Sequence, residues 1–335
     1  MTPPAPGSAA LTPLSRRTLL AASVAAVALP ASAQEAWSPT SPVRIIVPSP
    51  PGEVADLLMR MLAERLQPAL GQPVVVENRP GAGGTVGMEY AANQPADGTA
   101  AVMGGKWPTT IAPSLHPHLG YDPLRDMTPI ALIASVPQLF VVNKDFPVNA
   151  IGELVARARA NPGAIFYASP GNGTTQHLNM ELFASMTGVQ LTHVPYRGSG
   201  PALADLIAGQ VSLMSDTLAA LTGPVRGGQL RAIAVTSAER SPFFPDVPTV
   251  AEQHVPGYAS VDWIGLLGPR DLPDPIAARF EQEVARILRQ AQIRQRLAEA
   301  AFTPSFLDRR AFADFIASET TTWREVVQKA GVRLD

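Results

Sequence analysis

The chain of 335 residues contains no cysteine. Disulfide bonds, thiolate catalysis and cysteine metal sites are therefore excluded, and the fold has to be stable through its core alone. The sequence also lacks a clustered basic stripe that would neutralise phosphates, and it lacks an apolar segment long enough to cross a bilayer. We therefore expect a soluble mature protein that binds no nucleic acid.

Motifs of the common enzyme classes are missing as well. There is no G-x-S-x-G, H-E-x-x-H or G-x-x-x-x-G-K-[ST] sequence, and His116-Pro117-His118 is more typical of a surface loop than of a metal site. We expect no catalytic residues, no metal and no cofactor. A hydrolase or lyase that uses His177, His193 and Asp216 is the competing hypothesis, and it lacks a recognisable nucleophile and base pair.

The first 33 residues have the pattern of an export signal. Ser15-Arg16-Arg17 precedes an apolar stretch of 11 residues from Leu19 to Leu29, and Ala31-Ser32-Ala33 is a small-residue pattern that signal peptidases cut. We predict cleavage after Ala33, and the arginine pair fits twin-arginine and general secretory export equally well. Cleavage removes two arginines and no acidic residue, so 24 basic and 28 acidic residues give the mature chain a net charge of −4.

The mature chain alternates short β-branched segments with amphipathic ones. The predicted strands cover 43–47, 74–77, 99–103, 165–168, 190–195, 211–215 and 230–236, and two apolar stretches within 130–142 are separated at 135–137. The predicted helices cover 57–70, 85–93, 151–160, 175–187, 201–208, 275–300 and 310–331. This alternation indicates parallel sheets covered by helices on both faces, in two lobes with a cleft between them.

Ligands of open α/β sheets bind beyond the carboxyl ends of the strands, so the loops that follow these strands are the expected binding region. Pro50-Pro51-Gly52 and Gly171-Asn172-Gly173 each connect a strand to a helix, where backbone N–H groups and the helix dipole favour an anion. In the second loop, Asn172 and Thr174 fit turn and cap roles equally well. A third glycine stretch, 81–84, fails the spacing of a dinucleotide fingerprint and is interpreted as a tight turn.

Seven segments of the chain, in order and over nearly its full length, resemble the tripartite tricarboxylate transporter substrate-binding receptors, also called the Bug family. They are "SPVRIIVPSPPGEVADLLMRMLAERL", "GQPVVVENRPGAGGTVG", "YDPLRDMTPIALIASVP", "YASPGNGTTQHLNMELF", "THVPYRGSGPALADLIAGQVSLMSD", "LRAIAVTSAERSPFFPDVPTVAE" and "WIGLLGP". The resemblance implies a periplasmic, non-enzymatic receptor with the α/β fold of type II periplasmic binding proteins. It has two lobes, a hinge and an interlobe ligand cleft.

The resemblance also implies boundaries and partners. Residues 38–142 plus 254–335 form lobe one, and residues 143–253 form lobe two. A monomer is expected to close around a small carboxylate and to deliver it to the permease subunits in the membrane. A periplasmic sensor that presents its ligand to a signalling kinase remains an alternative, because both roles need only closure that depends on ligand.

The ligand-binding residues implied by the resemblance belong to the two strand-to-helix loops and to two further segments of lobe two. They are Ser49, Pro51, Gly52, Glu53, Val54, Ala55 and Asp56, followed by Ser169, Asn172, Gly173, Thr174, Thr175 and His177, and then Tyr196, Arg197, Gly198 and Asp216. Asp216 fits two roles equally, as an acceptor for a ligand amine or hydroxyl and as a cap of the following helix.

Two segments depart from the family pattern. Ser49 and Glu53 stand where the family has Phe and a second Gly, and Lys106-Trp107 replaces a small polar loop. Lys106 is expected to neutralise a second carboxylate and Trp107 to stack on the ligand, which favours a dicarboxylate or an aromatic carboxylate. The alternatives are a solvated Lys106 at the rim and a Trp107 packed between the lobes. Glu53 is expected to face solvent; the alternative is an inward side chain that pairs with Lys106 or selects a ligand with a donor group.

Overall fold

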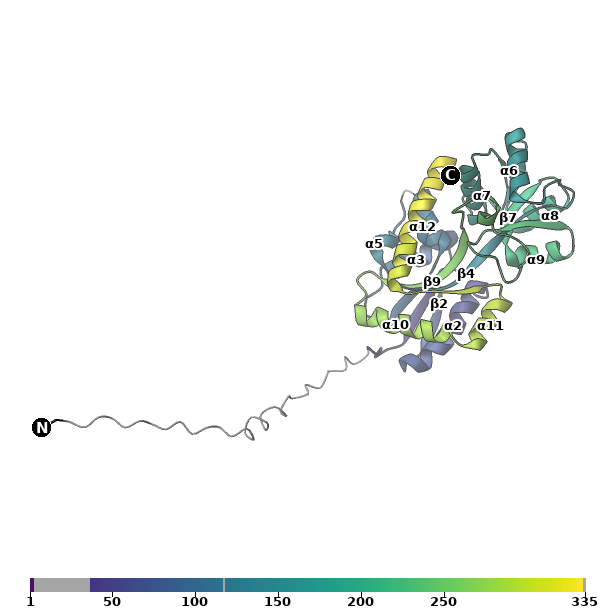
Figure 1. The fold of residues 1–335 in the computed structure, drawn as a ribbon. Helices are drawn as coiled ribbons and strands as arrows, with labels where there is room; N and C mark the ends of the chain where they lie inside the picture. Colours follow the sequence, from purple (N-terminus) through teal and green to yellow (C-terminus); the bar gives the residue numbers. More distant parts are fainter. Residues whose placement is uncertain (3–36, 117, 334–335) are drawn as a thin grey trace. The chain divides into compact units, whose positions relative to one another are not determined.

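The structure is a computed structural model that describes residues 1–2, 37–116 and 118–333. The predicted signal sequence therefore lies almost wholly outside the described residues. Residues from Trp37 onward form one unit. Its strands belong to a sheet with the order β2-β1-β3-β9-β4-β7-β5-β6, and β8 and β10 each pair with β4 (Figure 1).

The amino-terminal part of this sheet is mixed. Strands β1 (Val43–Val47), β2 (Val74–Asn78) and β3 (Ala100–Gly105) are parallel, whereas β9 (Val261–Pro269) is antiparallel to β3. The prediction of purely parallel sheets is therefore wrong. It failed because β9 returns from the far part of the chain, and the local alternation of strands and helices carries no information about that return.

Strand β4 (Met127–Asn143) connects the two parts of the sheet. Its segment from Met127 to Pro137 pairs with β9, and Gln138 to Asn143 pair with β7 (Leu213–Thr217) and β8 (Leu230–Val235). The predicted break at 135–137 is wrong, since Pro137 pairs with Val261 inside one continuous strand. Proline is tolerated there because β4 changes partners at the next residue, where the Gln138 N–H bonds to the Thr236 hydroxyl.

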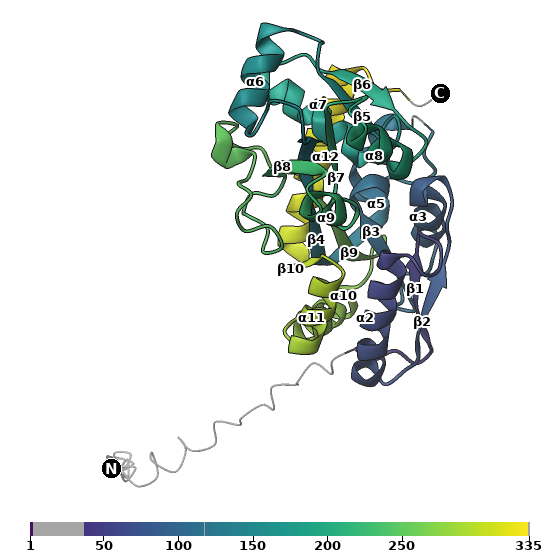
Figure 2. The same ribbon diagram turned by 90° about the vertical axis from the view of Figure 1, so that its right-hand side faces the viewer.

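The second part of the sheet places the second loop. Strand β5 (Phe166–Ser169) is parallel to β6 (Thr192–Pro195) and to β7, and β10 (Thr303–Leu307) pairs with β4 in the first part. Around these strands lie α6 (Ile151–Ala160), α7 (Thr175–Thr187), α8 (Ser199–Ile207) and α9 (Leu218–Arg226) (Figure 2). The loop between β5 and α7 is therefore at a strand carboxyl end, as predicted.

Helices cover both faces of the first part of the sheet. Those of the amino-terminal segment are α2 (Val54–Leu70) and α3 (Thr85–Ala92), with the short elements η1 (Ala82–Gly84), η2 (Trp107–Ile111), α4 (Ala112–Leu115) and α5 (Pro123–Asp126). The predicted helix 275–300 is two helices, α10 (Asp274–Leu288) and α11 (Ala291–Glu299), because Gln290 is extended. The change of direction lets Ile287 and Ile293 both reach the core.

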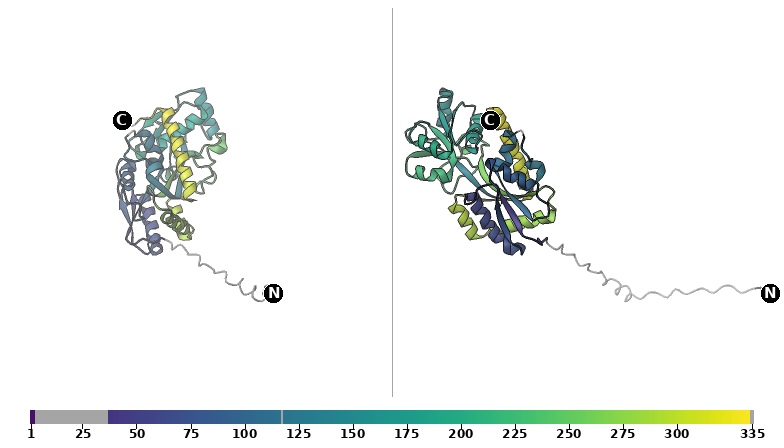
Figure 3. Two further views of the ribbon diagram at one scale, coloured as in Figure 1. Left: turned by 90° about the vertical axis from the view of Figure 1, so that its left-hand side faces the viewer. Right: turned by 180° about the vertical axis from the view of Figure 1, so that it is seen from behind.

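The carboxyl-terminal helix α12 (Arg309–Ala330) runs beside both parts of the sheet. It packs on β4 at one end and on α7 towards the other, and it is the yellow helix in Figure 3. Its buried Phe312 contributes to a core cluster with β3 and β9, and its buried Trp323 contributes to a second cluster with α7. Helix α12 therefore joins the two cores directly.

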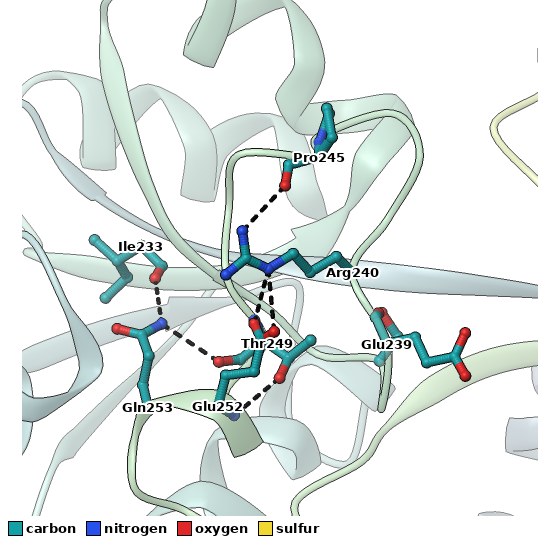
Figure 4. Close-up of polar contacts among 8 residues, drawn as sticks. Ile233, Glu239, Arg240, Pro245, Thr249, Glu252 and Gln253 are labelled. Carbon is teal, nitrogen blue, oxygen red and sulfur yellow. Dashed lines mark hydrogen bonds and ion pairs between the residues drawn. The ribbon is translucent and has the colours of Figure 1, made fainter.

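The turn-rich stretch between β8 and β9 is held by side chains rather than by strands. The Glu252 carboxylate accepts from Arg240 Nε at 3.0 Å and from the Thr249 N–H at 2.8 Å, and Thr249 Oγ1 accepts from the Glu252 N–H at 3.0 Å (Figure 4). This reciprocal pair spans the start of the short helix η3 (Ala251–Gln253). These side-chain contacts hold the segment between β8 and β9 in place.

Candidate ligand-binding site

The first loop, between β1 and α2, is organised by a buried carboxylate. Asp56 is 1% exposed, and its Oδ2 accepts from the Gly52 N–H and from Arg60 Nε, both at 2.9 Å. Its Oδ1 accepts from Asn78 Nδ2 at 2.9 Å, and the same amide group donates to the Ser49 carbonyl at 3.0 Å. The side chain of Asp56 therefore binds its own loop.

The charge of Asp56 suits this role. Burial alone would raise the pKa of the carboxyl, but the hydrogen bonds from Arg60, Gly52 and Asn78 together outweigh burial and lower the pKa. Asp56 is thus an anion at neutral pH, and its oxygens are occupied by protein donors. The family resemblance indicated Asp56 and Gly52 as ligand contacts, whereas in this structure the Gly52 N–H and the Asp56 carboxylate bind each other.

A cavity of about 450 Å³ opens beside this loop. It is lined by Pro48, Ser49, Pro50, Glu53, Pro80, Gly81, Ala82, Gly83, Gly84, Met103, Gly105 and Pro108. The glycine stretch that was interpreted only as a tight turn therefore also forms a wall of the cavity. A larger groove of about 580 Å³ lies between α2 and α11 and contains no residue of either predicted loop.

Close approach explains why the wall of the cavity is rich in glycine. A Cβ added at Gly83 would lie 2.7 Å from the ring of Trp107, and Gly83 has φ +66°, a conformation that other residues rarely adopt. A Cβ at Gly84 would lie 3.1 Å from the Pro48 carbonyl. Substitution at either position would displace the residues that shape the cavity.

The second loop, between β5 and α7, is organised by neutral groups. Ser169 Oγ accepts from the Gly171 N–H at 3.1 Å, and His177 Nδ1 accepts from the Gly173 N–H at 3.0 Å. Thr174 caps α7 by accepting from the His177 N–H at 3.3 Å. Thr174 therefore has the helix-capping role that the sequence left open. The N–H groups of Gly171 and Gly173 both bind protein acceptors.

Two histidines stack beneath this loop. The ring centroids of His177 and His193 are 3.8 Å apart at an interplanar angle of 9°, and Tyr167 stacks on His193 at 4.9 Å. Burial, followed by the neighbouring charge of His193, lowers the pKa of His177 to about 3, and burial lowers the pKa of His193 to about 4. Both rings are therefore neutral at physiological pH.

The stack contains a serine–histidine contact that the sequence did not reveal. Ser169 Oγ lies 2.6 Å from His193 Nε2, a distance typical of a nucleophile and its base. Ser169 is fully buried, however, and its hydroxyl also bonds to the Gly171 N–H and carbonyl. This pair shapes the loop, and its hydroxyl is not placed to meet a substrate.

Several backbone N–H groups in the first turns of α2 and α7 have no protein acceptor. Within the described residues, no protein acceptor bonds to the N–H groups of Ala55 and Asp56 in α2, or of Thr175 and Gln176 in α7. Such groups, together with the helix dipole, form an anion site. The N–H of Asn172 also has no such acceptor. Among the predicted ligand-binding residues, Ala55, Asp56, Asn172 and Thr175 therefore have backbone N–H groups available for an anion.

Lys106 is buried away from the cavity. Its ammonium group donates to Ser260 Oγ at 2.6 Å and to Asn179 Oδ1 at 3.5 Å, and it lies 4.3 Å from the centroid of the Trp323 ring. Burial lowers the pKa of Lys106, an effect that the charges of Glu319 and Asp262 oppose. The solvated-rim alternative is wrong because the side chain is 2% exposed, and no Glu53–Lys106 pair forms among the described residues.

Trp107 connects the cavity wall to the second loop. Its Nε1 donates to the Gly173 carbonyl at 3.0 Å, and its ring packs against Gly83. This geometry matches the packing alternative for Trp107 rather than a free stacking face. One side chain therefore contacts both the 81–84 turn and the second predicted loop.

The remaining predicted residues lie around β6 and β7. Tyr196 donates its hydroxyl to Asp205 at 2.7 Å, and Gly198 donates its N–H to the Pro170 carbonyl at 3.0 Å, while Arg197 is exposed. Asp216 is 1% exposed; its Oδ1 accepts from Gln176 Nε2 and from the Thr217 N–H, and its Oδ2 has no partner. The cap of α9 is Thr217, so the capping alternative for Asp216 is wrong.

Comparison with known proteins places this chain in a family. The sequence profile of the tripartite tricarboxylate transporter family receptor matches residues 58–332. The chain belongs to this family. The BugT protein of Bordetella pertussis is 35% identical over 311 residues, which cover 92% of this chain and 95% of BugT.

Solved structures of family members have the same fold. Rpa4515 of R. palustris with adipate has a TM-score of 0.71 at 36% identity, covering 88% of this chain and 99% of that one. MatC of Rhodopseudomonas palustris with bound malate has a TM-score of 0.67 at 32% identity, covering 86% and 99%. The family and the α/β periplasmic-binding-protein fold predicted from the sequence are confirmed.

Membership establishes the general role. The tripartite tricarboxylate receptors are periplasmic proteins that bind a small solute for a tripartite transporter, so this chain is a solute-binding receptor. Among the described residues, no helix combines the length and apolarity needed to span a bilayer, and no group of three His, Asp or Glu side chains could hold a metal ion.

The sequence analysis did not identify two residues that hold the first loop in shape. Asn78 links Asp56 to the Ser49 carbonyl, and Arg60 completes the environment of the same carboxylate. Asn78 opens the segment "NRPGAGG", so its position after a strand was a usable signal. Arg60, one turn after Asp56 on α2, had the spacing of a helical ion pair.

Proposed function

We propose that this receptor binds the carboxylate of a small ligand at the first turns of α2 and α7 and delivers it to the membrane permease of a tripartite tricarboxylate transporter. One observation carries the proposal. Each loop bonds its own glycine N–H groups to Asp56, Ser169 or His177, and the first-turn N–H groups remain for an anion. Adipate and malate in two family structures are ligands of the same chemical class.

The proposal includes lobe closure and export. Residues 38–142 plus 254–335 would move against 143–253, with β4 as one crossing strand. A ligand favours the closed state only through its tighter binding to that state. Cleavage after Ala33 would release the mature receptor as a monomer into the periplasm.

Ligand-dependent thermal stability tests this function. The mature protein would be heated with monocarboxylates, dicarboxylates and aromatic carboxylates, because a ligand at 100 times its Kd stabilises a protein by about 2.7 kcal/mol. We expect at least one class to raise the Tm. If no carboxylate raised it, the anion site would be refuted.

A proline substitution tests whether the anion binds at the first turn of α2. Val54→Pro removes the first N–H of α2, and the preceding Glu53 is already extended, as proline requires. We expect about a tenfold loss of carboxylate affinity with little change in stability. Ala291→Pro, at the first position of α11 after an extended Gln290, is the matched control and should leave affinity unchanged.

A further inference from the structure

The cavity beside the first loop has an unusual charge. Among its described lining residues, Glu53 is charged, and none is a lysine, an arginine or a histidine. Two basic residues adjoin the lining in sequence: Lys106, which bonds to Ser260 and Asn179 instead, and Arg79, which pairs with Glu77. The electrostatic character of the cavity is therefore acidic.

Glu53 is placed to act on a ligand rather than on its own helix. It is the N-cap residue of α2, yet its side chain makes no cap hydrogen bond, and it is exposed at the cavity wall. No salt bridge in the described part of the chain involves it. Its carboxylate therefore keeps its full hydrogen-bonding capacity for a ligand in the cavity.

A second polar group of the cavity lining also lacks a hydrogen-bond partner. Ser49, also in the lining, has a buried Oγ with no hydrogen-bond partner. A buried hydroxyl of this kind gains stability from a partner that donates or accepts. Together, Glu53 and Ser49 provide acceptors for a donor-rich group, whereas a carboxylate would meet Glu53 without a compensating positive charge.

We propose that the ligand is an amino-carboxylate, whose carboxylate binds the first helical turns and whose ammonium group enters the cavity and pairs with Glu53. The inference rests on the proposed carboxylate site, and it adds the identity of the ligand's other end. It replaces the dicarboxylate preference drawn from the sequence, because that preference depended on Lys106 in the cavity.

Ligands of equal carbon number that differ in their terminal group test the charge directly. Kd values would be measured by calorimetry for 6-aminohexanoate, hexanoate and adipate, and for the shorter set 4-aminobutanoate, butanoate and succinate. We expect the amino-carboxylate to bind best in at least one set and the dicarboxylate to bind worst in it. An exposed ammonium–carboxylate pair corresponds to a preference of up to about fivefold over the uncharged analogue.

Substitution of Glu53 assigns the effect to this residue. Glu53→Gln should remove the preference for the amino group and improve dicarboxylate binding, with unfolding unchanged because no cap bond is lost. Glu64→Gln, an exposed carboxylate on the same helix but outside the cavity, is the control and should change neither.

The outcomes separate the two proposals. Tightest binding of a dicarboxylate in both sets, unaffected by Glu53→Gln, would leave the carboxylate receptor intact and overturn the amino-carboxylate inference. An amino preference that persists in Glu53→Gln would also overturn it, since another group would then recognise the ammonium. Binding by none of the six compounds would count against both the inference and the carboxylate site.

Discussion

The two loops of the site have the same plan but different chemistry. Each follows a strand and leads into a helix, and in each a buried side chain from the helix accepts a glycine N–H. In the first loop that acceptor is the Asp56 carboxylate, and in the second it is the neutral imidazole of His177. The comparison teaches that the glycines shape the loops while the first helical turns retain free donors.

The difference between the acceptors makes the loops respond differently to acid. Asp56 has a lowered pKa, so its stabilising contribution is present above its unfolded pKa near 3.8 and is lost only as pH falls below that value. His177 and His193 are neutral in the fold, and the unfolded chain protonates them near pH 6.5. Between pH 6.5 and about 4, acid is therefore expected to destabilise the second loop but not the first.

The largest predicted effect is acid destabilisation through the second loop. Between pH 6.5 and about 4, the unfolded state binds more protons at His177 and His193 than the folded state, so the free energy of unfolding falls as pH falls. Each histidine contributes about 1.4 kcal/mol per pH unit. After allowance for the partial exposure of His193 and for Glu181, whose raised pKa opposes the trend, we expect a loss of about 4 kcal/mol.

Urea unfolding at pH 7, 6, 5 and 4 measures this loss. His193→Asn replaces one imidazole by an amide that does not titrate, and the slope of stability against pH should then fall to about half. The groups in contact with the stack are Tyr167, Glu181 and Ser169; burial raises the pKa of the Glu181 carboxyl, and burial also raises the pKa of Tyr167, which stays protonated. An unchanged slope in the variant would assign the acid sensitivity to other residues.

The next largest effect is the removal of the first acceptor. Asp56→Ala leaves the Gly52 N–H and the Asn78 amide without their buried partner, so we expect a loss of about 3 kcal/mol in stability and a weaker ligand site. Denaturant unfolding and calorimetry measure the two effects. Glu64→Ala, exposed on the same helix, should change stability by less than about 0.5 kcal/mol. A mild result for Asp56→Ala would mean that the first loop holds its shape through its prolines.

The sequence predicted where the loops lie better than what their side chains do. Apolar spacing and glycine positions located β1, α2, β5 and α7 within a few residues, because those signals are local. The roles of Asp56, His177 and Lys106 depend on partners distant in sequence, such as Asn78, His193 and Ser260. A polar residue near a loop has the same sequence signal whether it faces a ligand or its own backbone.

The smallest predicted effect concerns the contact of Trp107 with the 81–84 turn and the second loop. Trp107→Phe keeps an aromatic ring against Gly83 but removes the Nε1 donor to the Gly173 carbonyl, so we expect about 1 kcal/mol less stability. Trp37→Phe, whose ring packs on Phe280 far from both loops, is the matched control for loss of indole volume. Because Trp107 contacts Gly83 in the cavity wall and Gly173 in the second loop, we expect Trp107→Phe, unlike Trp37→Phe, to weaken ligand binding by a few fold. Equal ligand affinities for the two variants would show that the Trp107 contact stabilises the fold without positioning the second loop for the ligand.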